Sequence, residues 1–201
     1  MPLLDAPRAL AAFGRLLRPG GTLAISFYGR PIFAGVGTPD DTTRLNALYE
    51  NVATRICSVF GQFAGTPAFP IRRRAVETFA SRLNNVAVPG DEWEHVVRYQ
   101  WNSDVQLFFN SKAVYDFDVD PVDRRQDVEV TKEITDRTWW QDKWDTDRIE
   151  AFLASVYPGY VERAGSKFAE INQILQQIRQ LLEEKKATLS FSAVLILATK
   201  K

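Results

Sequence analysis

The sequence feature that most constrains the fold is a helix stop followed at once by an apolar strand, within residues 10–28. Leucine and phenylalanine recur at helical spacing before the stop, which predicts an amphipathic helix with one buried stripe. Pro19 cannot continue this helix, and Gly20 or Gly21 can adopt the positive φ that ends it. Residues 22–28 are apolar or β-favouring, which is typical of a strand covered on both faces. A helix, a turn and a buried strand in this order predict an α/β fold.

Two longer strings identify the chain further. The first is RALAAFGRLLRPGGTLAISFYGRPIF at residues 8–33, and the second is LSFSAVLILATK at residues 189–200. They resemble the approach to the fifth strand and the last strand of class I S-adenosylmethionine-dependent methyltransferases, in particular a fungal branch related to trans-aconitate methyltransferase. The resemblance spans nearly the whole chain but only the C-terminal half of the family's domain. It implies a truncated Rossmann-like fold, with a tryptophan-rich lid, that forms one domain over residues 1–201.

The same resemblance implies that the family's cofactor site is missing. In the family, a glycine-rich turn after the first strand and an acidic residue on the next strand hold S-adenosylmethionine. None of the 11 glycines belongs to a G-x-G-x-x-G or E-x-G-x-G motif after a strand, and Gly20-Gly21 precedes one. A glycine turn lets the backbone approach a ligand without an intervening Cβ. We therefore expect no cofactor for this chain alone and assign it no cofactor-binding residue.

Composition excludes several classes of function. Lys and Arg together number 25, as do Asp and Glu, so a net charge near zero argues against nucleic-acid or anionic-membrane partners. The single cysteine, Cys57, excludes an internal disulfide and fits a reducing cytoplasm. Its apolar helical surroundings favour an inert core position. No apolar run reaches transmembrane length and the N-terminus lacks a signal-like apolar region, so we expect a cytoplasmic protein.

The remaining elements are predicted from spacing and turn residues. Asp5 can cap the first helix, and further helices are expected at about residues 40–60, 72–84, 147–156 and 166–186. Strands are expected at 94–101, 106–110, 113–119 and 189–199, the last of them central in the sheet. Residues 29–40 are expected to form a loop and residues 121–132 an exposed charged segment.

Candidate site residues follow the strand at 22–28, because ligands of open α/β sheets bind beyond the carboxyl ends of the strands. Tyr28, Arg30 and Phe33 are expected at the mouth of a cleft there, and the alternative is an ordinary loop at the end of the strand. Arg98 and Tyr99, on the strand at 94–101, are further polar candidates for the cleft.

His95 is the single histidine, and with Tyr28 it is the candidate for catalysis. It could act as a general base. The alternative is a histidine on a strand that hydrogen-bonds to a neighbour. A metal site is not expected, because no histidine or cysteine lies at zinc-ligand spacing from it.

Tryptophans form the other candidate group. Trp139, Trp140 and Trp144 lie within six residues, and Trp101 ends the strand at 94–101. Tryptophan buries a large area and carries one donor, so such a cluster suits a lid over a ligand or a hydrophobic anchor. The resemblance implies a lid over the acceptor substrate. Core packing is the alternative for at least one of the three. The predicted substrate-binding residues are Arg30, Phe33, Arg98, Trp101, Trp139, Trp140 and Trp144.

Three functions remain open, so the sequence leaves undecided whether the chain is an enzyme. The first is a methyltransferase-like protein that acts on or binds a small organic molecule. The second is a cofactor-free enzyme, for example a cyclase in small-molecule biosynthesis, that reuses the substrate pocket. The third is a non-catalytic binding or assembly module.

Association is expected from the strand at residues 22–28. The resemblance implies that this strand pairs with the last strand and lacks its other neighbour, and it carries no proline or charge to protect its edge. We expect a homodimer through this edge, with a different partner chain as the alternative.

Overall fold

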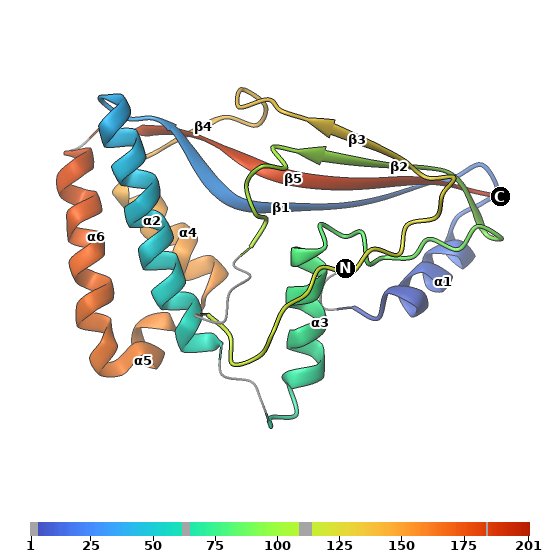
Figure 1. Ribbon diagram of the computed structural model, residues 1–201, viewed down its shortest axis with the longest axis horizontal. Helices are drawn as coiled ribbons and strands as arrows, with labels where there is room; N and C mark the ends of the chain where they lie inside the picture. The colour runs from blue at the N-terminus through green and yellow to red at the C-terminus, as the bar shows by residue number, and fades with distance from the viewer. Residues whose placement is uncertain (1–3, 62–64, 109–113, 184) are drawn as a thin grey trace.

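The centre of the protein is a five-stranded mixed sheet, seen in a computed structural model that describes residues 4–61, 65–108, 114–183 and 185–201 (Figure 1). Its strands are β1 (Thr22–Gly35), β2 (Trp93–Trp101), β3 (Val130–Ile134), β4 (Asp142–Trp144) and β5 (Ala187–Lys200). β5 pairs antiparallel with β1, β2 and β4, and β3 pairs parallel with β2. The predicted α/β fold with a central last strand is confirmed.

The helices are α1 (Ala6–Leu16), α2 (Pro39–Phe60), α3 (Phe69–Ala80), α4 (Thr146–Val156), α5 (Tyr160–Ala164) and α6 (Phe168–Leu182), with a 3-10 turn at Gly165–Lys167. Asp5 caps α1 by accepting from a backbone N–H group, as predicted, and Asp145 caps α4 in the same way. The helix predicted at 72–84 begins earlier, at Phe69. It also ends earlier, because Arg82 and Leu83 have left-handed backbone conformations. The helix at 166–186 is also shorter, since Glu183 ends α6 with φ +42°.

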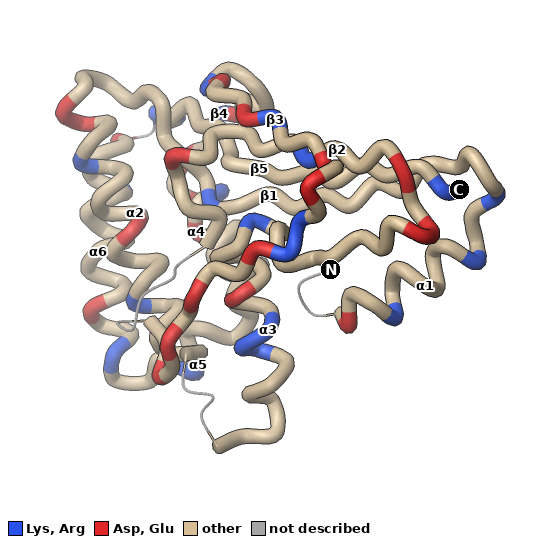
Figure 2. Tube along the Cα trace, turned by 45° about the vertical axis from the view of Figure 1, so that its right-hand side comes forward, with Lys and Arg blue, Asp and Glu red and all other residues tan. Residues whose placement is uncertain are grey.

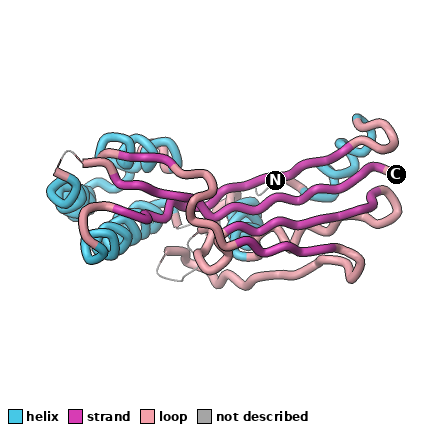
Figure 3. The backbone as a smooth tube through the Cα atoms, turned by 90° about the horizontal axis from the view of Figure 1, so that it is seen from above, coloured by secondary structure: helices cyan, strands magenta, loops and turns pink. Residues whose placement is uncertain are grey.

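β1 corrects two expectations. It continues through residues 29–35, where a loop was predicted. Within residues 22–28 its side chains alternate: Leu23 and Ile25 are buried, whereas Ala24 and Ser26 are exposed. The expectation that both faces are covered is therefore wrong for this half of the sheet. Figure 3 views the sheet from above, and in the half of the sheet near the C-terminus the strands lie in front of the helices.

Two hydrophobic cores lie at opposite ends of the sheet. The helical core joins α2, α4 and α6 to the first half of β5, and the sheet core joins α1 and the segment after α3 to its second half. Residues of β5 in the helical core are Ala187, Leu189 and Phe191; those in the sheet core are Val194, Ile196 and Ala198. Odd positions of β5 are buried in the helical core and even positions in the sheet core, so the twisted strand turns opposite sets of side chains toward the helices, which lie below the strands in both halves (Figure 1).

β1 matches this change in β5 through a bulge. Its register against β5 shifts between Tyr28 and Pro31, where one extra residue lies in β1. Ile25 before the bulge therefore belongs to the sheet core, and Phe33 after it belongs to the helical core. The bulge lies between the two cores.

The segment after β2 differs from its prediction. Residues 106–108 and 114–119 form no strand, and residues 109, 110 and 113 of the two predicted strands lie outside the described part of the chain. Residues 121–128 are mostly exposed, as expected, but the segment then continues into the edge strand β3. The Glu129 side chain is buried, at 1% exposure.

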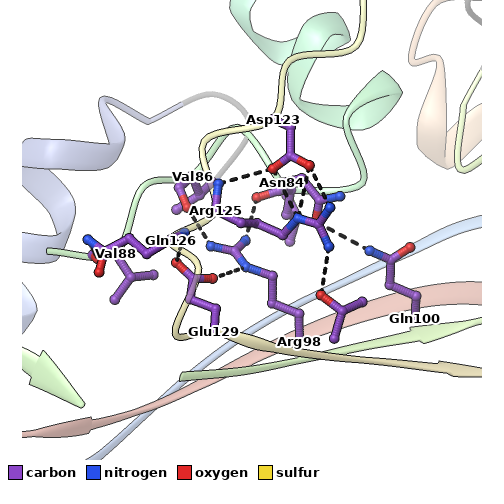
Figure 4. Close-up of polar contacts among 11 residues, drawn as sticks. Asn84, Val86, Val88, Arg98, Gln100, Asp123, Arg125, Gln126 and Glu129 are labelled. Atoms are coloured by element: carbon purple, nitrogen blue, oxygen red, sulfur yellow. Dashed lines mark hydrogen bonds and ion pairs between the residues drawn. The ribbon is translucent and has the colours of Figure 1, made fainter. Parts of the chain in front are cut away.

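Arg98 explains that burial (Figure 4). Its guanidinium is 2% exposed, forms an ion pair with Glu129, and donates to the carbonyl oxygens of Leu83 at 2.9 Å and Val86 at 2.8 Å. It thereby ties β2 to the segment after α3 and to the segment before β3. The substrate-binding role of Arg98 stays a prediction that this geometry does not support, because its donors are engaged inside the fold.

Replacement of Arg98 by Met should destabilise the protein strongly. Removing one member of a buried ion pair leaves the other charge without a partner, which costs about 3–5 kcal/mol. Urea unfolding measures this loss, and Arg44→Met, at an exposed position of α2, is the control. Equal stability of the two variants would contradict the structural role of Arg98.

Candidate functional site

A cavity of about 480 Å³ lies under the β1 bulge, between the two cores. Residues of α2, α3, α4 and α5 line it, together with Tyr28, Gly29 and Arg30 of the bulge. Its volume lies in the range of sites for small organic molecules, about 300–1,000 Å³. The structure therefore brings two predicted site residues, Tyr28 and Arg30, to one cavity wall.

The backbone at Gly29 explains how the bulge forms that wall. A Cβ atom at Gly29 would lie 2.5 Å from Ser192 Oγ and 2.7 Å from Leu107 Cα, so only glycine fits here. The N–H of Arg30 donates to Leu107 O at 3.1 Å. The segment after β2 thus crosses β1 at the bulge and contributes Leu107 and Phe108 to the lining.

Four buried polar groups gather in the lining, which we call the hydroxyl cluster: Tyr49, Cys57, Tyr115 and Tyr157. The Cys57 Sγ and Tyr115 Oη atoms are 3.6 Å apart. Burial raises the pKa of the Cys57 thiol and of all three tyrosine hydroxyls. These groups are therefore neutral near pH 7. The tyrosines are hydrogen-bond donors, and the thiol is a poor nucleophile.

Three arginines complete the polar lining: Arg30, Arg72 and Arg163. Arg30 lies 3.4 Å from Glu50 Oε1, and the guanidinium of Arg163 lies over the Phe60 ring, 5.0 Å from its centroid. The positive charge of Arg72 acts on the Tyr115 hydroxyl. No Asp or Glu is found among the described residues of the lining. The cavity is locally positive, although Figure 2 shows acidic and basic residues interspersed along the chain as a whole.

The predicted lid tryptophans lie behind the cavity wall and not among its lining residues. Trp101 stacks on Trp139, with ring centroids 4.6 Å apart, over the open face of the sheet. Trp140 meets the Tyr28 ring edge-on at 5.1 Å. Trp144 is buried and lies 5.0 Å from the ring of Phe152, a lining residue. Trp140 and Trp144 therefore support the wall from outside, and a role as a lid stays a prediction.

Two other candidates also lie outside the lining. Phe33 is 2% exposed and packs behind Tyr49, with ring centroids 5.3 Å apart. The His95 side chain is 77% exposed, at a bulge of β2 where φ is +52°. Its described ionic neighbour is Glu94, at 3.7 Å. The catalytic role of His95 stays a prediction that this geometry does not support.

Sequence reasoning missed the residues that make the cavity polar. Tyr49 and Cys57 stand in the apolar stripe of α2 and read as core, and Tyr157 follows the predicted end of α4. Arg163 lies in a short helix without a motif. A tyrosine within a helix's apolar stripe was the one available signal, because its hydroxyl must find a partner when buried.

The described residues do not fit S-adenosylmethionine, the cofactor that the resemblance implies. The lining sets three arginines and no carboxylate around a molecule that carries a sulfonium cation and a ribose. The Gly35-Val36-Gly37 turn between β1 and α2 is closed by a capping box, in which Asp41 Oδ2 accepts from Thr38 N at 3.0 Å. A Cβ at Gly37 would lie 2.6 Å from the same oxygen. This helix end is therefore filled by its own side chains.

Two further features are absent from the described part of the chain: a metal-binding cluster and a membrane-spanning helix. No cluster of three or more His, Cys, Asp or Glu residues there could hold a metal ion. No helix in it is both long and apolar enough to span a bilayer.

The whole chain is similar to fungal proteins named as methyltransferases. It is 51% identical over 204 residues to methyltransferase ptaI of Pestalotiopsis fici, covering 100% of this chain and 59% of that protein. It is 31% identical to methyltransferase cfoB of Aspergillus candidus and 28% identical to methyltransferase pgmE of Aspergillus terreus, again over its full length. The chain thus spans about 60% of the length of these relatives. No family model and no solved structure matches it.

Proposed function

We propose that the chain is a member of the methyltransferase family of these fungal relatives, binds a small organic molecule in the cavity and has no S-adenosylmethionine site of its own. On this proposal residues 1–201 form one methyltransferase-like domain of a cytoplasmic protein. The domain supplies the pocket for the molecule acted upon. Similarity over the whole of this chain, and over about 60% of the relatives' length, supports the family part of the proposal.

The cavity carries the binding part of the proposal. Its walls are mainly apolar and aromatic, and a small number of polar groups converge in it from α2, α3, α5 and the β1 bulge. Pockets for small molecules have this composition, because apolar walls supply affinity and a few polar groups fix orientation. The misfit with S-adenosylmethionine supports the part that concerns the cofactor.

Narrowing the cavity should weaken binding of a neutral aromatic probe. Val156 lines the mouth and is 40% exposed, so Trp at this position adds bulk without disturbing a core. We expect Val156→Trp to weaken binding of N-phenyl-1-naphthylamine at least about tenfold in a fluorescence titration. Val161→Trp is the matched control, since Val161 is 41% exposed on α5 but does not line the cavity. Equal affinity of both variants would show that the cavity is not the binding site.

S-adenosylmethionine itself should give no binding heat in a calorimetric titration of the purified chain. The physical reason is the set of arginines in the cavity and the self-capped end of α2. Binding at micromolar concentration would overturn this part of the proposal and point to a cofactor site of another design.

The hydroxyl cluster favours a second candidate, a cofactor-free enzyme. Neutral tyrosine hydroxyls beside a bound carbonyl group would polarise it, as preorganised donors do in catalysis. Chemical change of a bound molecule by the chain alone, followed by mass spectrometry, would separate this candidate from binding without catalysis.

Association through β1 is also part of the proposal. Among the described residues β1 pairs with β5 alone, and Ala24 and Ser26 are exposed beside the free edge. Light scattering should give a mass near twice 22.8 kDa for a homodimer. Ser26→Lys should halve that mass, whereas Ser155→Lys on α4 should not. A monomeric wild-type chain would contradict the homodimer and leave a different partner chain as the alternative.

A further inference from the structure

We infer that the cavity selects an aromatic anion, with the negative group held by arginines at the mouth and the rings held against aromatic walls. This inference rests on the proposed function, since it names the class of molecule that the pocket takes. The class includes aromatic carboxylates and phenolates. Charge, wall shape and the placement of the hydroxyl cluster support it independently.

The first argument for an anionic ligand is the charge of the lining. Arg30, Arg72 and Arg163 approach the cavity from β1, α3 and α5, and no carboxylate of the described lining opposes them. Guanidinium groups bind carboxylates and other oxyanions through two parallel hydrogen bonds. Glu50, outside the lining, pairs with Arg30. An organic cation would therefore meet the like charges of Arg72 and Arg163, and the lining discriminates by the sign of the ligand's charge.

Arg163 is the best placed of the three. It is exposed, its guanidinium lies over the Phe60 ring, and none of the described carboxylates pairs with it. Arg30 already has Glu50 as a partner. An anion can therefore pair with Arg163 without breaking an existing ion pair, and the ring below keeps the guanidinium at the mouth.

The second argument, for an aromatic ligand, is the shape of the walls. Phe79 of α3 lies between Phe27 and Phe108, with ring centroids at 4.5 and 5.0 Å, and all three line the cavity. Phe60 and Phe152 line other parts of it. Flat aromatic surfaces on several sides favour a flat aromatic ligand, because rings stack or meet edge-on at such distances.

The third argument is the change of polarity from the mouth of the cavity to its interior. Tyr115 and Tyr157 are 5% and 8% exposed, whereas Arg163 is exposed, so polarity changes from charged at the mouth to neutral in the interior. The tyrosine hydroxyls can donate to a second oxygen at the far end of the ligand. Charge outside and neutral donors inside give the ligand one orientation.

Two matched probes test the inference. 8-Anilinonaphthalene-1-sulfonate and N-phenyl-1-naphthylamine share their rings, and only the first carries an anionic group. We expect the sulfonate to bind more tightly, and Arg163→Gln to weaken it about tenfold while changing the affinity for the neutral probe far less. Arg163→Lys should restore part of the affinity, and Arg44→Gln should change neither probe. Higher salt should weaken the sulfonate selectively.

The outcomes separate this inference from the proposed function. If the neutral probe binds and Val156→Trp blocks its binding, the proposed function, binding of a small molecule in the cavity, is supported. Equal affinity of both probes, or no effect of Arg163→Gln on the sulfonate, then overturns the selection of anions alone. If the sulfonate binds but Val156→Trp leaves it unchanged, it binds outside the cavity and the inference fails. If neither probe binds, the proposed function fails as well.

Discussion

The antiparallel ladder between β1 and β5 is the interaction on which the rest of the structure depends. It joins the first strand of the chain to the last, from Thr22 opposite Thr199 to Gly35 opposite Thr188. Along this ladder the buried positions of β5 change from odd in the helical core to even in the sheet core. The bulge at residues 28–31 adds one residue to β1, so that Phe33 lies opposite Leu189 in the helical core. The cavity lies where the two cores separate.

This position gives the cavity its mixed chemistry. The helical core supplies Tyr49, Cys57 and Tyr157 to one side, and α3 supplies Arg72 and Phe79 to another. Burial outweighs the nearby charges of Arg30 and Arg72 and keeps the tyrosine hydroxyls neutral, whereas the guanidinium groups carry positive charge. Pockets for small molecules combine apolar walls with a few polar groups in this way, and the proposed function rests on that likeness.

The sequence predicted the fold further than the site. Local signals were strong for the cap at Asp5 and for the buried run of β5, and the structure confirms them. Pro31 suggested a loop, but the bulge absorbs it within β1. Arg98 resembled a cleft residue because its partner, Glu129, lies 31 residues away in a segment without a pattern. Tyr115 and Arg163 reach the cavity through tertiary contacts, which no local spacing reveals.

The central claim is that the ligand binds between the two cores, and not on the tryptophan-bearing open face of the sheet. A crystal structure of the chain soaked with 8-anilinonaphthalene-1-sulfonate tests it most directly. We predict electron density for the rings of the probe against Phe79 and Phe60, with its sulfonate beside Arg163 and the cavity filled. Density over Trp101 and Trp139, with the cavity empty, would contradict it.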